Sequence, residues 1–364
     1  MIRTRLAGGI ALGGLALAVA IAAPGWRDHG QTGPRAATVA AGPEDLIAAL
    51  AGAATGAGER LSGPWALDLP ADLGGHAGAR AETWIVALHL RDAAGLPVGA
   101  TLTLSRLALA PGSEAASLAL RDVHAAGLSL GGPGLAARRE DRIGRGLGAA
   151  GADGGAVWQD DWRLCFGGAA GAPLDLAAAT GDLRLRVRLD PAKPALALDP
   201  AGQGPARGLL LPRLTVTGTL GAGETTRPVT GTALLAHLWG DLPPGDAAGP
   251  VIRDRLVVQL DDGSDLSLER TRRRDGIGPA LVEGLAIAPD GTATALAGLE
   301  MTEDGSGRWQ LAGDGLTLGL ALLVETGGGP GGGRTALVEA RGLRDGRAVT
   351  GLGTLELGRA EAAT

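Results

Sequence analysis

Histidine and tryptophan are the first candidates for chemistry, because the chain has 5 His, 7 Trp, 1 Cys and no Tyr. The stretch TALLAHLWGDLPPG (232–245) has the pattern of a strand that ends in a turn, and it places His237 two residues before Trp239. Residues two apart in a strand share one face. Both rings are therefore expected to look the same way, into a core, a cavity or solvent.

Two other segments and one later strand contain most of the remaining unusual side chains. The stretch LPADLGGHAGARAETWIVALHL supplies Asp72, His76, Glu82 and Trp84. The stretch AVWQDDWRLC supplies Trp158, Asp160, Asp161 and Trp162, and Asp254 begins a later strand. Carboxylates and imidazoles of this kind could perform acid–base chemistry, since a carboxylic acid held in an apolar setting has a raised pKa.

The elements that must position these side chains are strands. The clearest example is DLRLRVRLD (182–190), where leucine and valine alternate with arginine and so give one apolar face and one solvated face. Many similar short runs follow one another, separated by Asp-Gly dipeptides that favour tight hairpins. The pattern predicts an all-β fold of the sandwich or barrel type.

The N-terminus has the features of an export signal. Arg3 and Arg5 precede an apolar run from Leu6 to Pro24, which would nearly cross a bilayer. Residues 1–24 are therefore interpreted as a signal peptide or a membrane anchor, and the remainder as exported: periplasmic, secreted or anchored to the inner membrane facing the periplasm. The lone Cys165 excludes an internal disulfide. The predicted organisation is a tether over 25–60, a first barrel over 61–241 and a second barrel over 246–360.

Several motifs match by letters but lack their structural context. GLGAAG (146–151) has no strand before it and no helix after it, so no dinucleotide is expected there. Ser129 in GLSLG is interpreted as an ordinary turn or strand residue, and the basic run ERTRRRDG (269–276) as a solvated edge. Stacking aromatics for nucleic acid are nearly absent, and no His/Cys cluster has zinc spacing. No cofactor, metal or nucleic acid is expected.

The order of the motifs resembles a family of exported lipocalin-like proteins, the AttH-like secreted hydrolases, which includes carotenoid hydratases. The resemblance spans roughly residues 60 to 358. The family's Pro-x-Asp-x-Gly-x-His segment matches 70–76, its Glu-Trp-Trp-Tyr motif matches 82–85, and its Trp-x-Asp-Asp-Trp strand matches 158–162. Its His-Glu-Trp-Gly motif corresponds to His237-Leu238-Trp239-Gly240. The resemblance implies two tandem lipocalin-like β-barrels, which can enclose a small apolar ligand.

The resemblance also implies site residues and their roles. By position, Asp254 would be the acid that protonates an alkene, Trp239 the ring that stabilises the resulting cation, and His237 the orienting base. His76, Glu82, Trp84 and Trp162 would line the ligand site. The chain departs from the family pattern at Thr83, Ile85, Leu238, Ile252, Arg253 and Arg255. These departures favour structural roles for many of the candidate site residues.

Two functions follow as hypotheses. In the first, the protein binds an apolar molecule, a lipid or isoprenoid, or serves an envelope transport system, with catalysis eroded or absent. Its partners would be that small molecule, an ABC-type permease of the kind associated with the family, and the membrane through the N-terminal helix. In the second, it is a hydratase or hydrolase acting on an isoprenoid or lipid.

Overall fold

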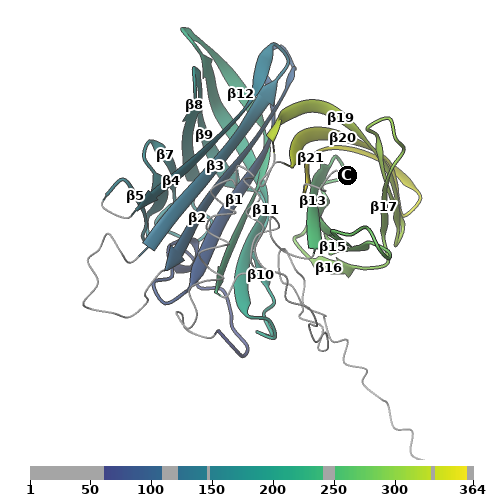
Figure 1. Cartoon of the computed structure of the whole chain (residues 1–364), viewed down its shortest axis with the longest axis horizontal. Helices are drawn as coiled ribbons and strands as arrows, with labels where there is room; N and C mark the ends of the chain where they lie inside the picture. Colours follow the sequence, from purple (N-terminus) through teal and green to yellow (C-terminus); the bar gives the residue numbers. More distant parts are fainter. Residues whose placement is uncertain (1–60, 109–121, 146–147, 241–250, 329–332, 359–364) are drawn as a thin grey trace, which may run out of the picture.

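The computed structural model describes residues 61–108, 122–145, 148–240, 251–328 and 333–358. Within these ranges the chain folds almost entirely as antiparallel strands, with one short 3-10 helix, η1 (Ala71–Leu73). The prediction of an all-β fold is confirmed, and the strands curl into the two barrel-like bodies of Figure 1. The expected N-terminal helix lies outside the described residues. Among those that are described, no helical segment has the length and hydropathy of a membrane span.

The first body is a 12-stranded sheet. Its strands follow the order β4-β3-β2-β1-β12-β11-β9-β8-β7-β6-β5, and β10 pairs with β11. The strands are β1 (Ala81–Asp92), β2 (Pro97–Ala108), β3 (Asp122–Gly132), β4 (Leu135–Arg145), β5 (Ala150–Ala152), β6 (Ala156–Gln159), β7 (Trp162–Cys165), β8 (Leu174–Thr180), β9 (Leu183–Pro191), β10 (Leu196–Leu198), β11 (Ala206–Ala222) and β12 (Thr225–Gly240). The pairing of β1 with β12 brings the beginning and the end of this body together.

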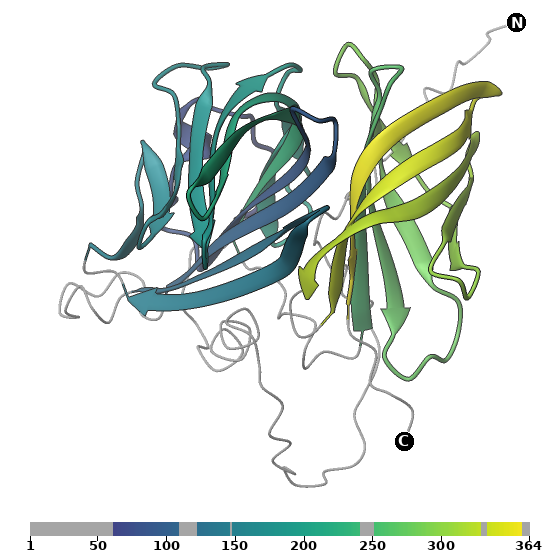
Figure 2. The same cartoon turned by 90° about the horizontal axis from the view of Figure 1, so that it is seen from above.

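The second body is a 9-stranded sheet in the order β16-β15-β14-β13-β21-β20-β19-β18-β17. Its strands are β13 (Val251–Leu260), β14 (Asp265–Arg273), β15 (Leu281–Ile287), β16 (Ala293–Leu296), β17 (Glu300–Glu303), β18 (Trp309–Gly313), β19 (Leu316–Gly328), β20 (Arg334–Arg344) and β21 (Arg347–Leu357). Figure 2 shows the two curved sheets side by side. Positive φ angles at Gly263, Gly291, Gly305 and Gly346 confirm the predicted Asp-Gly hairpins.

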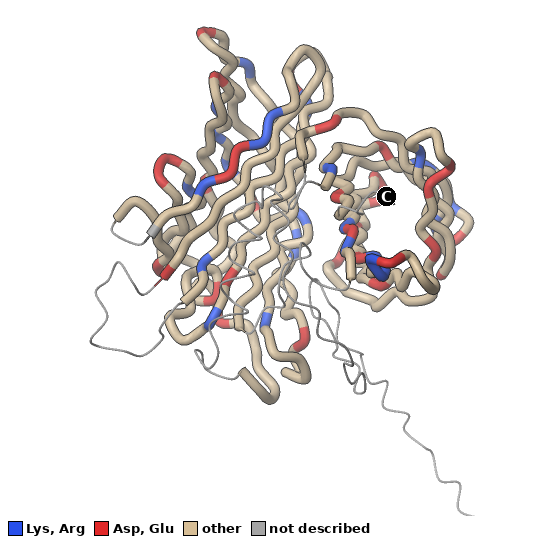
Figure 3. Tube along the Cα trace, viewed as in Figure 1, with Lys and Arg blue, Asp and Glu red and all other residues tan. Residues whose placement is uncertain are grey.

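Each body has its own apolar core, which is built from alternate residues of the strands. In β9, Leu183, Leu185, Val187 and Leu189 are buried and the arginines between them are exposed, as their alternation predicts. Ser129 is a buried residue of β3, which confirms that it is an ordinary strand position. The acidic and basic residues are interspersed along the trace, including an alternating run on β4 (Figure 3).

A side chain of β4, at one end of the first sheet, contacts β7 near the other end. The guanidinium of Arg142 on β4 lies 4.0 Å from the ring centroid of Trp162 on β7, and it also pairs with Asp161 at 2.5 Å. The indole of Trp162 is fully buried and donates to the carbonyl of Ala179 at 2.7 Å. A cation over an aromatic face is attractive, so this contact helps to draw the sheet towards closure.

The two bodies share an apolar interface. It is formed by the outward residues of β10, β11 and β12 against residues of β13 and β15, which pack into one buried cluster. The members of this inter-barrel cluster are Leu198, Leu210, Leu234, Ala236, Leu238, Val257, Leu285 and Ile287. Strand β12 therefore turns one face to the first core and the other to the second body.

Polar contacts complete this interface. His89 on β1 contacts Gln259 Oε1 through Nδ1 and Thr354 Oγ1 through Nε2, both at 3.0 Å. The only lysine, Lys193, lies 2.6 Å from Asp265 Oδ2, and Arg213 donates to Asp265 Oδ1 at 2.8 Å. Since all three side chains of this second group are largely buried, they hold the two bodies in a defined relation.

Candidate functional site

Strands β1 and β12 bring two of the sequence motifs into register, residues 82–85 and residues 237–240. Glu82 lies directly opposite Trp239, and Trp84 lies directly opposite His237. Directly opposed residues of an antiparallel pair lie on the same face of the sheet. The four side chains therefore form one patch on the inner face of the first body, where Trp84 and Trp239 join the core.

The segment before β1, residues 70–80, covers this patch and is called the covering segment below. Helix η1 buries Leu73, whose carbonyl accepts a hydrogen bond of 3.0 Å from the indole Nε1 of Trp84. At Gly74 a side chain would stand 2.6 Å from the carbonyl oxygen of Asp153, so only glycine allows the segment to approach so closely. The segment is thereby fixed over β1, with Asp72 and His76 directed at the patch.

The aromatic rings of the site stack in two pairs. The imidazole of His76 stacks on Trp239 at a centroid distance of 4.1 Å, and that of His237 stacks on Trp84 at 4.3 Å. The two imidazoles lie 5.4 Å apart, and Trp65 meets the edge of Trp239 at 5.3 Å. His237 and Trp239 do look the same way, into the barrel. One face of each stacked indole is already covered by an imidazole.

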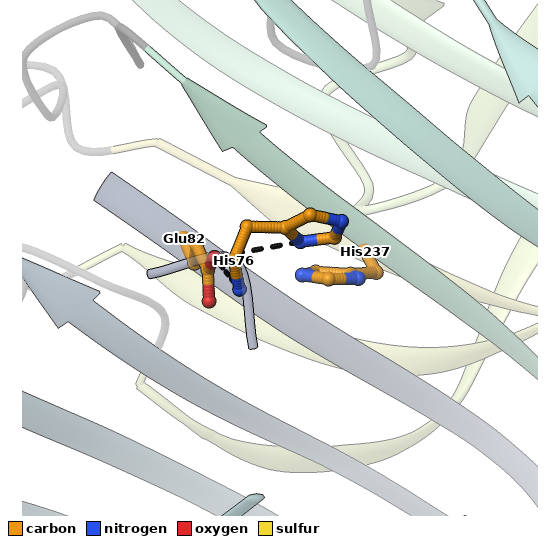
Figure 4. Close-up of side chains that lie close together, drawn as sticks. All are labelled: His76, Glu82 and His237. Carbon is orange, nitrogen blue, oxygen red and sulfur yellow. Dashed lines mark hydrogen bonds and ion pairs between the residues drawn. The ribbon is translucent and has the colours of Figure 1, made fainter. Parts of the chain in front are cut away.

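Polar contacts fix how each imidazole is oriented. His237 donates from Nδ1 to the carbonyl oxygen of Asp72 at 2.9 Å. The Nε2 atom of His76 lies 3.2 Å from Asp72 Oδ1, and its Nδ1 atom lies 3.4 Å from Glu82 Oε1. Figure 4 shows His76, Glu82 and His237 together with the contacts that join His76 to Glu82. Asp72 therefore orients both rings, one through its backbone and one through its side chain.

Glu82 is fully buried and is held from two sides. The backbone N–H of His76 donates to Glu82 Oε1, and a guanidinium nitrogen of Arg106 lies 3.3 Å from the same oxygen. Arg106 also donates to the carbonyl oxygens of His76 and Ala79, at 2.6 and 3.1 Å. This arginine compensates the buried carboxylate and holds the covering segment.

Burial lowers the pKa of His237 well below its ordinary value of 6.5, and a positive charge on neighbouring His76 would lower it further. The bond to the Asp72 carbonyl opposes this shift only in part. His237 is therefore a neutral imidazole with its proton on Nδ1, which leaves the Nε2 lone pair unused. Burial is the largest cause of the lowered pKa, as expected for a histidine that faces the interior.

The sequence predicts Asp254 as a site residue, but the structure places it on β13 in the second body. Its carboxylate is fully buried in the second body, where it accepts hydrogen bonds from Arg270, Arg272 and the backbone N–H of Gly358, at 2.8, 3.0 and 2.9 Å. None of these partners belongs to the His76–Glu82–His237 patch. The basic run 269–276 is a solvated edge only at its end: β14 is paired on both sides as far as Thr271 and two of its arginines bind Asp254, whereas Arg273 and Asp275 are exposed. Trp162 is likewise a core residue beside Arg142, and none of the ring contacts of the His/Trp patch involves it.

In the first body, the positions where the chain departs from the family pattern lie on the opposite face of the strands. Thr83 and Ile85 alternate with Glu82 and Trp84 along β1, and Thr83 hydrogen-bonds Ser105 rather than a site residue. Leu238 belongs to the inter-barrel cluster. The inner face of the site thus keeps its polar and aromatic residues, and the changes fall on the other side of the sheet.

The sequence interpretation missed Arg106 as a site residue. Arg106 shares the inward face of β2 with Leu102 and Leu104, both of which are buried. An arginine at an apolar position of an alternating strand must meet a carboxylate if it is buried. That pattern is the signal that could have identified it.

Comparisons with known proteins agree with this architecture. A family model described as AttH-like matches residues 60–329. The crystal structure of an AttH protein from Nitrosomonas europaea superposes with a TM-score of 0.65 at 19% identity, over 82% of this chain and 98% of that one. Kievitone hydratase from Nectria haematococca superposes with a TM-score of 0.51 at 11% identity, over 83% of this chain and 98% of that one. No curated protein matches the sequence.

Proposed function

We propose, from the premise that this chain belongs to the AttH-like family, that its first barrel activates water for the hydration or hydrolysis of an apolar small molecule. The observation that carries the proposal is the convergence of three buried atoms, His76 Nδ1, Glu82 Oε2 and His237 Nε2. None of them has a hydrogen-bond partner among the described residues. Buried polar atoms are ordinarily paired, because leaving them unpaired costs free energy. A site that binds and activates a polar group accounts for all three.

The surroundings favour a ligand with an apolar body. The polar patch adjoins the main core of the first body, and indoles of Trp65, Trp84 and Trp239 surround its imidazoles. Apolar sites with a few convergent polar groups are typical of small-molecule binding. This arrangement supports a lipid or isoprenoid as the substrate class.

The chemistry follows from the lone pairs. A water molecule held at the patch can give a proton to the free nitrogen of His237 while its oxygen forms a bond to a substrate carbon. In hydration of a polarised double bond, the proton then returns to the adjacent carbon. In ester hydrolysis it passes to the departing alkoxide oxygen. Both reactions consume one water, and both restore the neutral imidazole.

The proposal is tested by incubating the full chain with isoprenoids whose double bond is conjugated to a carbonyl and with fatty-acyl esters, and analysing the products by mass spectrometry. We expect a product that has gained one water, or the acid and alcohol from an ester. Glu82→Gln and His237→Ala should abolish turnover. Thr83→Val, which changes the neighbouring side chain on the opposite face of β1, should leave it intact.

Two outcomes would count against catalysis at this site. Turnover that survives both site variants would place the chemistry elsewhere. Tight binding of a lipid by wild-type protein without any turnover would support the alternative role, a carrier for an envelope transport system. Native mass spectrometry of the purified protein distinguishes the two, because it detects a retained ligand directly.

A further inference from the structure

We infer that His76, Glu82 and His237 form a three-ligand site for a divalent metal ion of the zinc type. The inference deepens the proposed function, since it names the group that would activate water at that site. One ligand atom from each residue lies within 4.8 Å of the others, and His237 comes from a part of the sequence far from His76 and Glu82. Their spacing along the chain follows no zinc motif, which is why no metal is expected from the sequence.

The first argument is the state of His237. Its Nδ1–H bond to the carbonyl of Asp72 fixes the tautomer and directs the Nε2 lone pair inward. The side chain is fully buried, and Nε2 has no partner among the described residues. A histidine whose outer nitrogen is anchored to a carbonyl while the inner one is free is the usual arrangement of a metal ligand.

The second argument is that the two ring nitrogens of His76 have the same arrangement as those of His237. Its Nε2 atom faces the carboxylate of Asp72 at 3.2 Å, so the proton of a neutral ring belongs on Nε2. Its Nδ1 atom is buried and makes no hydrogen bond within the described residues, and its contact is the 3.4 Å approach to Glu82 Oε1. Carboxylate–histidine pairs of this kind raise the basicity of a metal-binding nitrogen. One residue, Asp72, thus orients both candidate histidine ligands.

The third argument is that no other described residue places a hydrogen-bond donor between the three atoms. The patch directs His76 Nδ1, His237 Nε2 and a Glu82 oxygen at one another, and lone pairs repel unless a cation or proton lies between them. Glu82 Oε1 is used by the backbone of His76 and by Arg106, but Oε2 has no partner in the described chain. Arg106 contacts Glu82 but also pairs with Asp122 at 3.0 Å, so its positive charge is shared between two carboxyl groups. A divalent cation satisfies both the geometry and the charge.

Two histidines and a glutamate are a set of ligands that zinc enzymes use when a water completes the coordination. Zinc–nitrogen and zinc–oxygen bonds are ~2.0–2.2 Å long, so atoms within 4.8 Å of one another need side-chain movement on the order of 1 Å to close around an ion. A bound cation lowers the pKa of its water towards neutrality. With a metal ion on His237 Nε2, that nitrogen would no longer accept the proton, and the lowered pKa of the water would replace the imidazole step described for the metal-free site.

The test uses the full chain, stripped with a chelator and titrated with Zn²⁺ and with Co²⁺ by isothermal titration calorimetry. We expect one ion per chain, a rise in melting temperature on Zn²⁺ addition, and the visible absorption of four- or five-coordinate Co²⁺. Cobalt should also quench tryptophan fluorescence, because Trp84 and Trp239 stack directly on the two histidine ligands.

Variants separate this site from adventitious binding. Glu82→Gln and His237→Ala should lose stoichiometric binding, and Asp72→Asn should weaken it by ~10–100-fold, the usual effect of removing a group that orients a ligand. His89→Gln is the matched control, because His89 is also a buried histidine but lies on β1 and contacts the second body. Circular dichroism confirms that each variant is folded.

The inference is overturned if folded wild-type protein binds no ion, or if Glu82→Gln and His237→Ala bind as well as wild type. It is also overturned if NMR shows a protonated His76 paired with Glu82 and unaffected by Zn²⁺, since a proton would then fill the centre. Turnover or lipid binding by metal-free protein would leave the proposed function standing without the metal. Metal binding without turnover and without lipid binding would leave the metal site standing and would count against the proposed function.

Discussion

His89 should make the stability of the protein depend on pH in the weakly acidic range. The ring is buried between the two bodies, and burial lowers its pKa from 6.5 to about 4, with Arg213 adding to the effect and the Gln259 bond opposing it. Gln259 uses its amide nitrogen to donate to the carbonyls of Pro212 and Ala233, so its oxygen must accept from His89 Nδ1. The hydroxyl of Thr354 can then donate to Nε2, and the neutral ring is fully satisfied.

The sign follows from proton uptake. Between pH 6.5 and about 4 the unfolded chain binds a proton at His89 that the folded chain does not, so the free energy of unfolding falls as the pH drops through this window. At ~1.36 kcal/mol per pKa unit, the loss approaches about 3 kcal/mol once the pH is below 4, and is already about 2.5 kcal/mol at pH ~4.5. Above pH ~6.5 this residue makes no pH-dependent contribution.

The assay is urea unfolding, followed by tryptophan fluorescence, of wild type and His89→Gln at several pH values from 7 to 4.5. The variant is expected to be less stable at pH 7, by about 1–3 kcal/mol, because it disturbs a buried hydrogen-bond network. It should lose less stability than wild type on acidification, so the two curves should converge by about 2.5 kcal/mol at the acidic end. Because other buried histidines titrate in both proteins, only the difference between the curves reports on His89. Parallel curves would refute the reasoning, since they would mean that His89 takes up its proton equally in both states.

Two further substitutions probe the packing. Trp162→Ala should lower the free energy of unfolding by ~3–5 kcal/mol, because it empties a fully buried site and removes the face that Arg142 covers; an unchanged urea midpoint would contradict this. Lys193→Met should cost ~3–5 kcal/mol by leaving the buried Asp265 carboxylate with Arg213 alone. Small-angle X-ray scattering of the second variant should also show a less uniform relation between the bodies, and a profile and midpoint identical to wild type would show that Lys193 is not needed there.

Strand alternation explains why the fold could be predicted from the sequence. In β9 each leucine and valine of the apolar series is buried, and the Asp-Gly dipeptides do form hairpins. The same local rules place Trp84 beside Glu82 on one face of β1. The rules do not state which strands become neighbours, since that depends on contacts between residues far apart in the chain.

Asp254 and Arg106 show the limit of the approach for the site. Asp254 was assigned by its position after His237, but pairing within the second sheet gives its carboxylate to Arg270 and Arg272. Arg106 was overlooked because its partner Glu82 is on another strand. Motif order identified His76, Glu82, Trp84, His237 and Trp239, which do converge. Only the three-dimensional pairing could add the covering role of Asp72 and the charge balance from Arg106.

The pairing of β1 with β12 has a consequence for how the molecule comes into being. His76 lies just before β1, Glu82 lies on β1 and His237 lies on β12, the last strand of the first body, so His237 meets the other two only after nearly all of that body's sequence has been made. Closing such a long loop carries a large entropic cost, and topologies dominated by distant contacts fold slowly. A nascent chain that ends before Thr225 contains His76 and Glu82 but no His237. The candidate site is therefore completed only in a late step of folding, because incomplete chains lack His237 and cannot form all three of its contacts.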